Sequence, residues 1–216
     1  MTRIILSIVI LISISTAANA QFTKGSGLLG GTLSYTSSKT DYSNPPDNYK
    51  NNYGNFNISL GKAIRENAVF GININYRPRS YDYQAGNGIY KNTENGYGIG
   101  IFYRLYKSLG KEFYLFGEAG GGYIGSSTTS KDSLGNKVAT SNSNGGQIYL
   151  SPGIAYKISK KFFIELSIPQ LFTIAYSSIK TKSGSMTTSS SDYFNVDASL
   201  DSNPLSNLGI GFRLIL

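Results

Sequence analysis

Few side chains in this sequence could carry out acid–base chemistry, because the chain contains neither His nor Cys. Glu118 and Glu165 could act together only as a pair of carboxylates, one as general acid and one as base. Ser residues are plentiful, but a Ser nucleophile needs a neighbouring general base, and His is not available for that role. We therefore predict that the protein is not an enzyme, with no catalytic residues, no metal site and no cofactor.

Two acids and two bases are better explained as ion pairs in a closed interior. Arg104, Glu118, Glu165 and Arg213 stand among glycines at alternate positions of apolar segments, on the parity opposite to the apolar side chains. Their charges cancel, and buried charges are tolerated when they pair with one another. Taken singly, each could also be an ordinary solvated residue.

The elements that would position these charges are strands in which apolar and polar residues alternate. One parity of each strand is apolar, whereas the other carries Gly, Asn, Gln and the four charged residues. A composition with 25 Gly, 17 Tyr and only 6 Pro suits antiparallel β-structure joined by polar connections. Eight such segments lie near 27–37, 53–64, 68–77, 96–106, 112–124, 146–158, 161–176 and 205–216.

Three features favour lipid over a protein core as the environment of the apolar parity. Short turns alternate with long polar connections, and apolar-face aromatics gather near both ends of the strands. Interior charges balance, as a narrow barrel requires. We predict an all-β fold: an eight-stranded antiparallel up-and-down transmembrane β-barrel with short periplasmic turns and four long extracellular loops. Pro152 and Pro169 fall inside strands, as bulges or as strand ends.

The N-terminus predicts export. Arg3 precedes an apolar stretch that is short for a membrane span, and Ala18-Asn19-Ala20 follows as a cleavage signal. We therefore expect a cleaved signal peptide over 1–20 and one barrel domain over 21–216.

The C-terminus predicts how such a barrel closes. Its last strand alternates apolar side chains to the final residue, and this strand must pair with the first because lipid cannot satisfy open backbone groups. The pattern resembles the signal read by the outer-membrane barrel assembly machinery, although it ends on Leu where that signal usually ends on an aromatic residue. The residues of this C-terminal signal are Leu208, Ile210, Phe212, Leu214 and Leu216.

Several segments give the chain a family resemblance. "GYGIGIFYRLY", "EFYLFGEAGGGYIG", "GIAYKISKKFFIELSI" and the last strand resemble the small outer-membrane β-barrel proteins of Gram-negative bacteria, in particular the type common in Bacteroidetes. The resemblance implies a fold and a place, the bacterial outer membrane, more than an activity. Small barrels of this kind include lipid A acyltransferases and deacylases that use a His base, which this chain lacks. Asp132-Ser133-Leu134 resembles a short O-glycosylation motif of exported Bacteroidetes proteins.

The expected function is therefore structural or a surface interaction, with a narrow lumen filled by side chains. Expected partners are outer-membrane lipids, lipopolysaccharide, the assembly machinery and an extracellular protein or glycan bound by loops; nucleic acid is not expected. A first alternative is a barrel that binds or transports a small hydrophobic molecule; a second is a soluble exported β-sandwich binding module. The first would use a lumen pocket at Gly98, Gly100, Gly120, Gly122, Phe102 and Phe116.

Overall fold

The computed structural model of the chain describes residues 22–43, 46–85, 88–184, 186–198 and 208–216. The predicted signal peptide over 1–20 lies outside these residues. No helix long and apolar enough to cross a bilayer occurs among them. The described strands are β1 (Gly27–Ser43), β2 (Pro46–Arg65), β3 (Ala68–Ala85), β4 (Gly88–Gly110), β5 (Phe113–Lys131), β6 (Lys137–Lys157), β7 (Phe162–Ser167), β8 (Phe172–Ser183), β9 (Met186–Ala198) and β10 (Gly209–Ile215).

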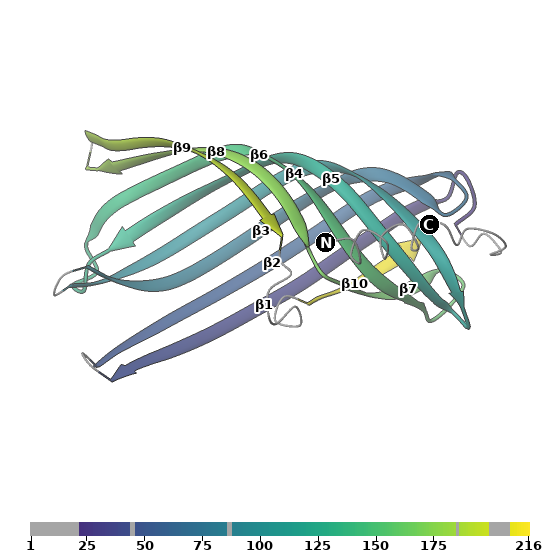
Figure 1. Cartoon of the computed structure of the whole chain (residues 1–216), viewed down its shortest axis with the longest axis horizontal. Coiled ribbons are helices and arrows are strands. Elements are labelled where there is room, and N and C mark those ends of the chain that lie inside the picture. Colours follow the sequence, from purple (N-terminus) through teal and green to yellow (C-terminus); the bar gives the residue numbers. More distant parts are fainter. Residues whose placement is uncertain (1–21, 44–45, 86–87, 185, 199–207) are drawn as a thin grey trace, which may run out of the picture.

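The strands pair antiparallel in one sheet that closes on itself (Figure 1). From β1 to β6, each strand pairs with the next one along the chain. The β5–β6 pairing connects the run from β1 to β5 with β6, which also pairs with β7 and β8. β7 and β8 follow one another along β6, so together they fill one strand position. β10 pairs with β7 on one side and with β1 on the other. The predicted antiparallel up-and-down barrel with eight strand positions is confirmed.

Apolar side chains face outward and polar side chains face the interior, as the alternation predicts. Along β3, Ile72 and Ile74 are 48% and 59% exposed, whereas Asn73 between them is only 5% exposed. Apolar side chains of β2, β4, β6 and β10 are exposed on the same outer face, where Phe56 stacks on Tyr76 and Phe113 packs against Tyr156. The sheet therefore wraps a polar and aromatic interior, which excludes a sandwich of two sheets packed over an apolar core.

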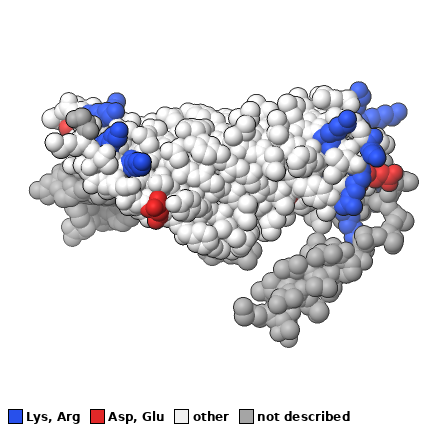
Figure 2. Space-filling view, turned by 90° about the horizontal axis from the view of Figure 1, so that it is seen from above, with Lys and Arg blue, Asp and Glu red and all other residues white. Residues whose placement is uncertain are grey.

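Charged residues avoid the middle of the outer surface. In the space-filling view, the Lys, Arg, Asp and Glu side chains lie at the two ends, and the band between them carries no charge on the face shown (Figure 2). On β4 the exposed apolar series from Tyr97 to Leu105 covers nine residues. A transmembrane β-strand needs about 9–11 residues, so this band has the height of a bilayer core.

Most segments predicted as long loops are strands that continue past this band. β4 runs for 23 residues, and β3–β4 pairing extends from Ala68↔Leu105 to Ala85↔Gly88. At about 3.4 Å per residue, β4 is about 75 Å long, more than twice the thickness of a hydrocarbon core of about 30 Å. The short turns of the prediction are present at 66–67, 111–112 and 158–161. Long paired hairpins therefore project from the other end of the barrel (Figure 1).

The two prolines have different places. Pro152 lies within β6, whose register with β5 runs through it without a shift. Pro169 lies between β7 and β8, where residues 168–171 face residues 151–152 of β6. The amides there find other partners, since Ile168 N–H donates to Pro152 O at 3.0 Å and Gln170 N–H to Ser151 Oγ at 2.8 Å. Pro169 therefore ends a strand within a local bulge, and Pro152 faces that bulge.

The register of the closing seam is testable, because the chain has no native Cys. Leu33 and Ile210 are directly opposite across β1 and β10, and both side chains are exposed. Opposite residues of antiparallel strands are about 4.5–5.5 Å apart at Cα, within reach of a disulfide. We expect the L33C/I210C variant to form an intramolecular disulfide, seen as a reductant-sensitive gel shift after unfolding. The L33C/F212C variant, two residues out of register, is the control; equal cross-linking of both would contradict this seam.

Candidate functional site

All four charges predicted to face the interior lie in one cluster near the short-turn half of the barrel. Arg104 is its centre: Nη2 is 2.7 Å from Glu118 Oε2, and Nη1 is 2.7 Å from Glu165 Oε2. The Arg104 guanidinium also lies over the Phe116 ring, at 4.3 Å from its centroid. Arg104 and Glu118 are opposite one another on β4 and β5, so strand register alone brings them together.

Arg213 of the last strand completes the cluster. Its Nη2 lies 3.1 Å from Glu165 Oε2, and its Nη1 donates to Ser59 Oγ at 2.8 Å. Arg213 and Glu165 are each only 1% exposed, so neither is screened by water. A Cβ on Gly30 would overlap the Arg213 guanidinium, so this position of β1 has room only for glycine while the ion pair holds. Arg213 thus links β10 to β7 and β2 through the interior, in addition to the backbone pairing between β1 and β10.

Hydroxyl and amide groups complete the hydrogen bonding of both carboxylates. Tyr106 OH donates to Glu165 Oε1 at 3.0 Å, and Tyr149 OH donates to Glu118 Oε1 at 3.0 Å. Asn73 Nδ2 in turn donates to Tyr149 OH at 2.8 Å. The sequence analysis did not assign Ser59, Tyr149 or Asn73 to this cluster. Their polar side chains on the inward parity were the available signal, but the partner of each depends on register across several strands.

An aromatic layer closes the lumen below the charges. Phe22 is fully buried and stacks on Tyr106 and Phe163, with ring centroids 4.2 Å and 5.2 Å apart. The backbone holds Phe22 in place, since Asn67 N–H donates to Phe22 O at 3.1 Å. The sequence analysis missed Phe22, a single aromatic residue in a short segment without any periodicity. Tyr114 and Phe116 are also buried in this layer.

The glycines predicted to line a lumen pocket lie against side chains and backbone of neighbouring strands, although Gly120, Gly122 and Phe102 also line an apolar hollow of about 610 Å³. A Cβ on Gly120 would overlap the Tyr149 ring, and one on Gly98 or Gly100 would lie 3.2 Å or less from Asn75 or Asn73. Gly122 lies directly against the β4 backbone. Phe102 and Phe116 are 1% and 2% exposed and belong to the aromatic layer. Side chains from other strands therefore occupy the predicted pocket, and the glycines make room for them.

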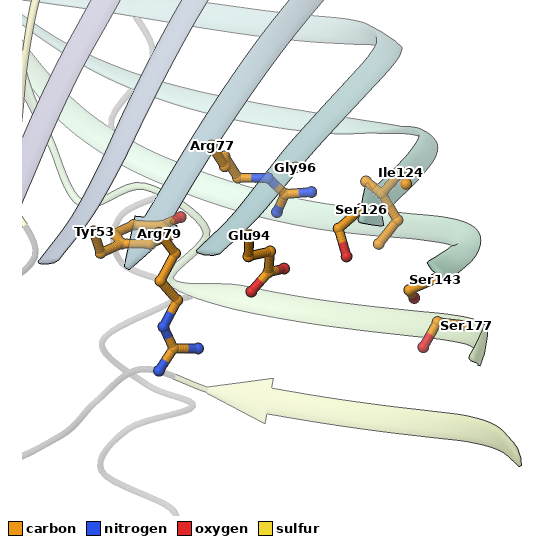
Figure 3. Close-up of a pocket in the computed structure, with 10 residues that line it drawn as sticks. Tyr53, Arg77, Arg79, Glu94, Gly96, Ile124, Ser126, Ser143 and Ser177 are labelled. Carbon is orange, nitrogen blue, oxygen red and sulfur yellow. The ribbon is translucent and has the colours of Figure 1, made fainter. Parts of the chain in front are cut away.

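The open part of the lumen lies higher, toward the hairpins. A polar hollow of about 240 Å³ is lined by side chains from β2 to β6 and β8 (Figure 3). Arg77 and Arg79 of β3 and Glu94 of β4 lie on one side of this hollow, and Ser126, Ser143 and Ser177 lie on the other. This group was not predicted from the sequence, because all of the named residues except Arg77 lie in segments expected to be loops, near 78–95, 125–145 and 177–204.

The Asp132-Ser133-Leu134 motif forms the tip of the β5–β6 hairpin. Asp132 Oδ1 accepts hydrogen bonds from Leu134 N–H at 3.0 Å and Asn136 N–H at 2.8 Å. Desolvation raises the pKa of Asp132, but hydrogen bonds from Asn136, Leu134 and Gly135 outweigh it and bring the pKa below its usual value. Leu134 is 85% exposed, so the turn presents the motif to solvent.

Both interior carboxylates are engaged in ion pairs and hydrogen bonds. Each interior carboxylate already accepts hydrogen bonds from an arginine and a tyrosine, and the aromatic layer and the barrel wall surround them. Among the described residues, no group of three or more acidic, His or Cys side chains is placed to hold a metal ion. The cluster can cross-brace strands and block the lumen.

Comparisons with known proteins give structural likenesses only. No family model and no curated protein sequence matches the chain. Among solved structures, Neisserial surface protein A (NspA) aligns with a TM-score of 0.40 and 13% identity, over 89% of this chain and 98% of that one. Ail, the attachment invasion locus protein of Yersinia pestis, aligns with a TM-score of 0.39 and 12% identity, over 89% of this chain and 100% of that one. Likenesses this low leave the role of the chain open.

We expect substitution of Glu165 and substitution of Glu118 to destabilise the barrel by different amounts. In the Glu165→Gln variant, Arg213 loses the carboxylate with which it pairs and two buried cations face one carboxylate, so we expect about 3–5 kcal/mol of destabilisation. The Glu118→Gln variant, in which Arg104 keeps Glu165, should lose about 1–3 kcal/mol. Urea unfolding of the refolded barrel in detergent micelles measures both. Equal losses in the two variants, or none at Glu165, would contradict the central role of Glu165.

Proposed function

We propose that the chain is an integral protein of the bacterial outer membrane, and that it acts as a plugged scaffold presenting long hairpins for surface interactions. The observation that carries the proposal is the exposed apolar band on a closed sheet with a polar interior, a band that carries no charge on the face shown in Figure 2. Soluble monomers rarely expose apolar patches above about 300–600 Å², whereas a lipid-facing belt must be continuous. Closure of the sheet leaves the spanning part without open edges, as a bilayer requires.

The two ends of the band support an orientation. The basic residues of the short turns suit the anionic phospholipid headgroups of a periplasmic leaflet, with Lys62, Arg65, Lys107, Lys111, Lys160 and Lys161 among them. The hairpins project from the opposite end and would face the outside of the cell, next to lipopolysaccharide. The C-terminal residues Leu208 to Leu216 lie in and beside β10, where the barrel assembly machinery would read them before closure.

The projecting hairpins are the working surface in this proposal. β9 is exposed along its length, and within the described residues it pairs with β8 alone. From Met186 to Val196, the second side of β9 is paired with no other described strand, and such an edge can bind an extended peptide as an added strand. A surface-exposed protein or glycan is the partner that such hairpins suit. Transport of a small hydrophobic molecule through the lumen is less favoured, because the lumen has polar side chains above the ion cluster and is blocked below it.

A charge placed on the outer face tests the membrane assignment. Ile74 lies in the middle of the band, so an Ile74→Arg variant should lose about 2–4 kcal/mol of stability in lipid bilayers. Ser80→Arg is the matched control, since Ser80 is on the same face of β3 but beyond the band, and we expect a change within about 0.5 kcal/mol. Unfolding in liposomes and heat-modifiable gel migration provide the measurement. A wild-type mature protein that is monomeric in water without detergent would overturn the proposal.

Because the lumen is blocked, we expect the barrel not to conduct ions. In planar bilayers we expect the wild-type protein to show no stable unitary conductance, because Phe22, the ion cluster and the aromatic layer fill the passage. Membrane insertion must be verified independently by protease protection of the spanning strands. Reproducible channel openings from verified, folded protein would show instead that the barrel conducts.

A further inference from the structure

The lumen above the ion cluster is built like a ligand site. The hollow of about 240 Å³ lies on the hairpin side of a smaller gap of about 60 Å³, and this gap is also lined by Arg104, Glu118 and Arg213 of the cluster. Arg77 lines both spaces, together with amide and hydroxyl side chains of the inward parity. The hollow is smaller than the range of about 300–1,000 Å³ that is usual for drug-sized ligands, so it suits a molecule with a single ring.

Arg77 is the interior cation without a partner. Arg104 and Arg213 are both held by carboxylates, and Arg79 donates to Asn51 and lies 4.6 Å from the Tyr81 ring centroid. Within the described part of the chain, the Arg77 guanidinium makes no hydrogen bond or ion pair, whereas the Arg77 backbone belongs to the β3–β4 ladder. Glu94 is the acidic residue that lines the hollow, and it lies opposite Arg79 in the β3–β4 register. The lining carries one net positive charge, which favours an anion.

The backbone leaves room for Arg77 to reach the hollow. Its partner across β3 and β4 is Gly96, and a Cβ there would lie 3.3 Å from Arg77 Cβ and 3.7 Å from Nε. Without a side chain at Gly96, the guanidinium extends across β4 toward Ser126 (Figure 3). A guanidinium binds a carboxylate through two parallel hydrogen bonds, so Arg77 presents a specific donor pair to a ligand.

A second unsatisfied group lies next to it along the strand. Asn75 Oδ1 is buried and has no hydrogen-bond partner among the described residues, and Asn75 lines the gap below Arg77. Buried acceptors are nearly always satisfied by protein, water or ligand. Ser126, Ser143 and Ser177 add three hydroxyls on the far wall. A fitting ligand therefore carries one carboxylate together with several hydroxyl groups.

We propose that this hollow binds a small hydroxylated carboxylate of the size of a monosaccharide acid. The carboxylate pairs with Arg77, a ligand hydroxyl donates toward Asn75 Oδ1, and the serines bind the remaining hydroxyls. This ligand site goes beyond the scaffold role, since surface contacts of the hairpins do not require it.

D-glucuronate and D-glucose differ in one group, so comparing their binding tests whether the site recognises the carboxylate. Calorimetric titration of the refolded protein in detergent with D-glucuronate should show saturable binding below about 10 mM, with D-glucose at least about tenfold weaker. The Arg77→Gln variant should bind glucuronate at least about tenfold more weakly than wild type. Lys131→Gln, which removes an exposed cation at the end of β5, is the matched control and should bind as wild type does. Both variants are first verified as folded by heat-modifiable migration.

Three outcomes would overturn the ligand site. They are no saturable glucuronate binding to folded wild-type protein, equal binding of glucose and glucuronate, and unchanged binding in the Arg77→Gln variant. Inorganic phosphate serves as an anion without a sugar ring: binding as tight as that of glucuronate would show a simple anion site and overturn the sugar acid. None of these results depends on the outer-face test of membrane location, so the two proposals fail separately.

Discussion

Closure of the sheet is the constraint on which the rest of the structure depends. Backbone groups facing lipid have no solvent to bind, so every strand in the band must be paired on both sides. The β1–β10 pairing supplies the last of these contacts, and the interior reinforces it through Arg213, which reaches from β10 to Glu165 on β7 and Ser59 on β2. The charges thus act across the same seam that the backbone closes.

The interior resolves a conflict between charge burial and barrel width. A lumen surrounded by eight strand positions has little room for water, so charges there require partners rather than hydration. Two arginines and two glutamates meet this need as a neutral group, with Tyr106 and Tyr149 satisfying the remaining carboxylate lone pairs. Glycines on neighbouring strands give the large side chains their space. The same packing that stabilises the barrel also closes its passage.

The sequence predicts the part of this fold that lies in the proposed membrane band. There, one face meets apolar surroundings and the other a packed interior, so alternation marks each strand and places Arg104, Glu118, Glu165 and Arg213 inside. Beyond the band both faces of a hairpin meet water, and Ser-rich and Thr-rich strands such as β9 lose the periodic signal. Phe22 could not be assigned because a single residue without periodicity reveals no partner, and Ser59 could not because its partner depends on register across several strands. The Arg77 hollow was missed because it lies among those unpredicted strands.

The two strands that close the barrel, β1 and β10, lie far apart in the sequence, and this separation affects when the sheet can close. β10 follows β1 at a long distance in the sequence, so the sheet can close only after all the strands between them have been synthesised. Contacts between sequence-distant strands form slowly, and until then both edges remain open to aggregation. Loss of the seven residues of β10 would leave β1 and β7 each with an unpaired edge, so the barrel could not close.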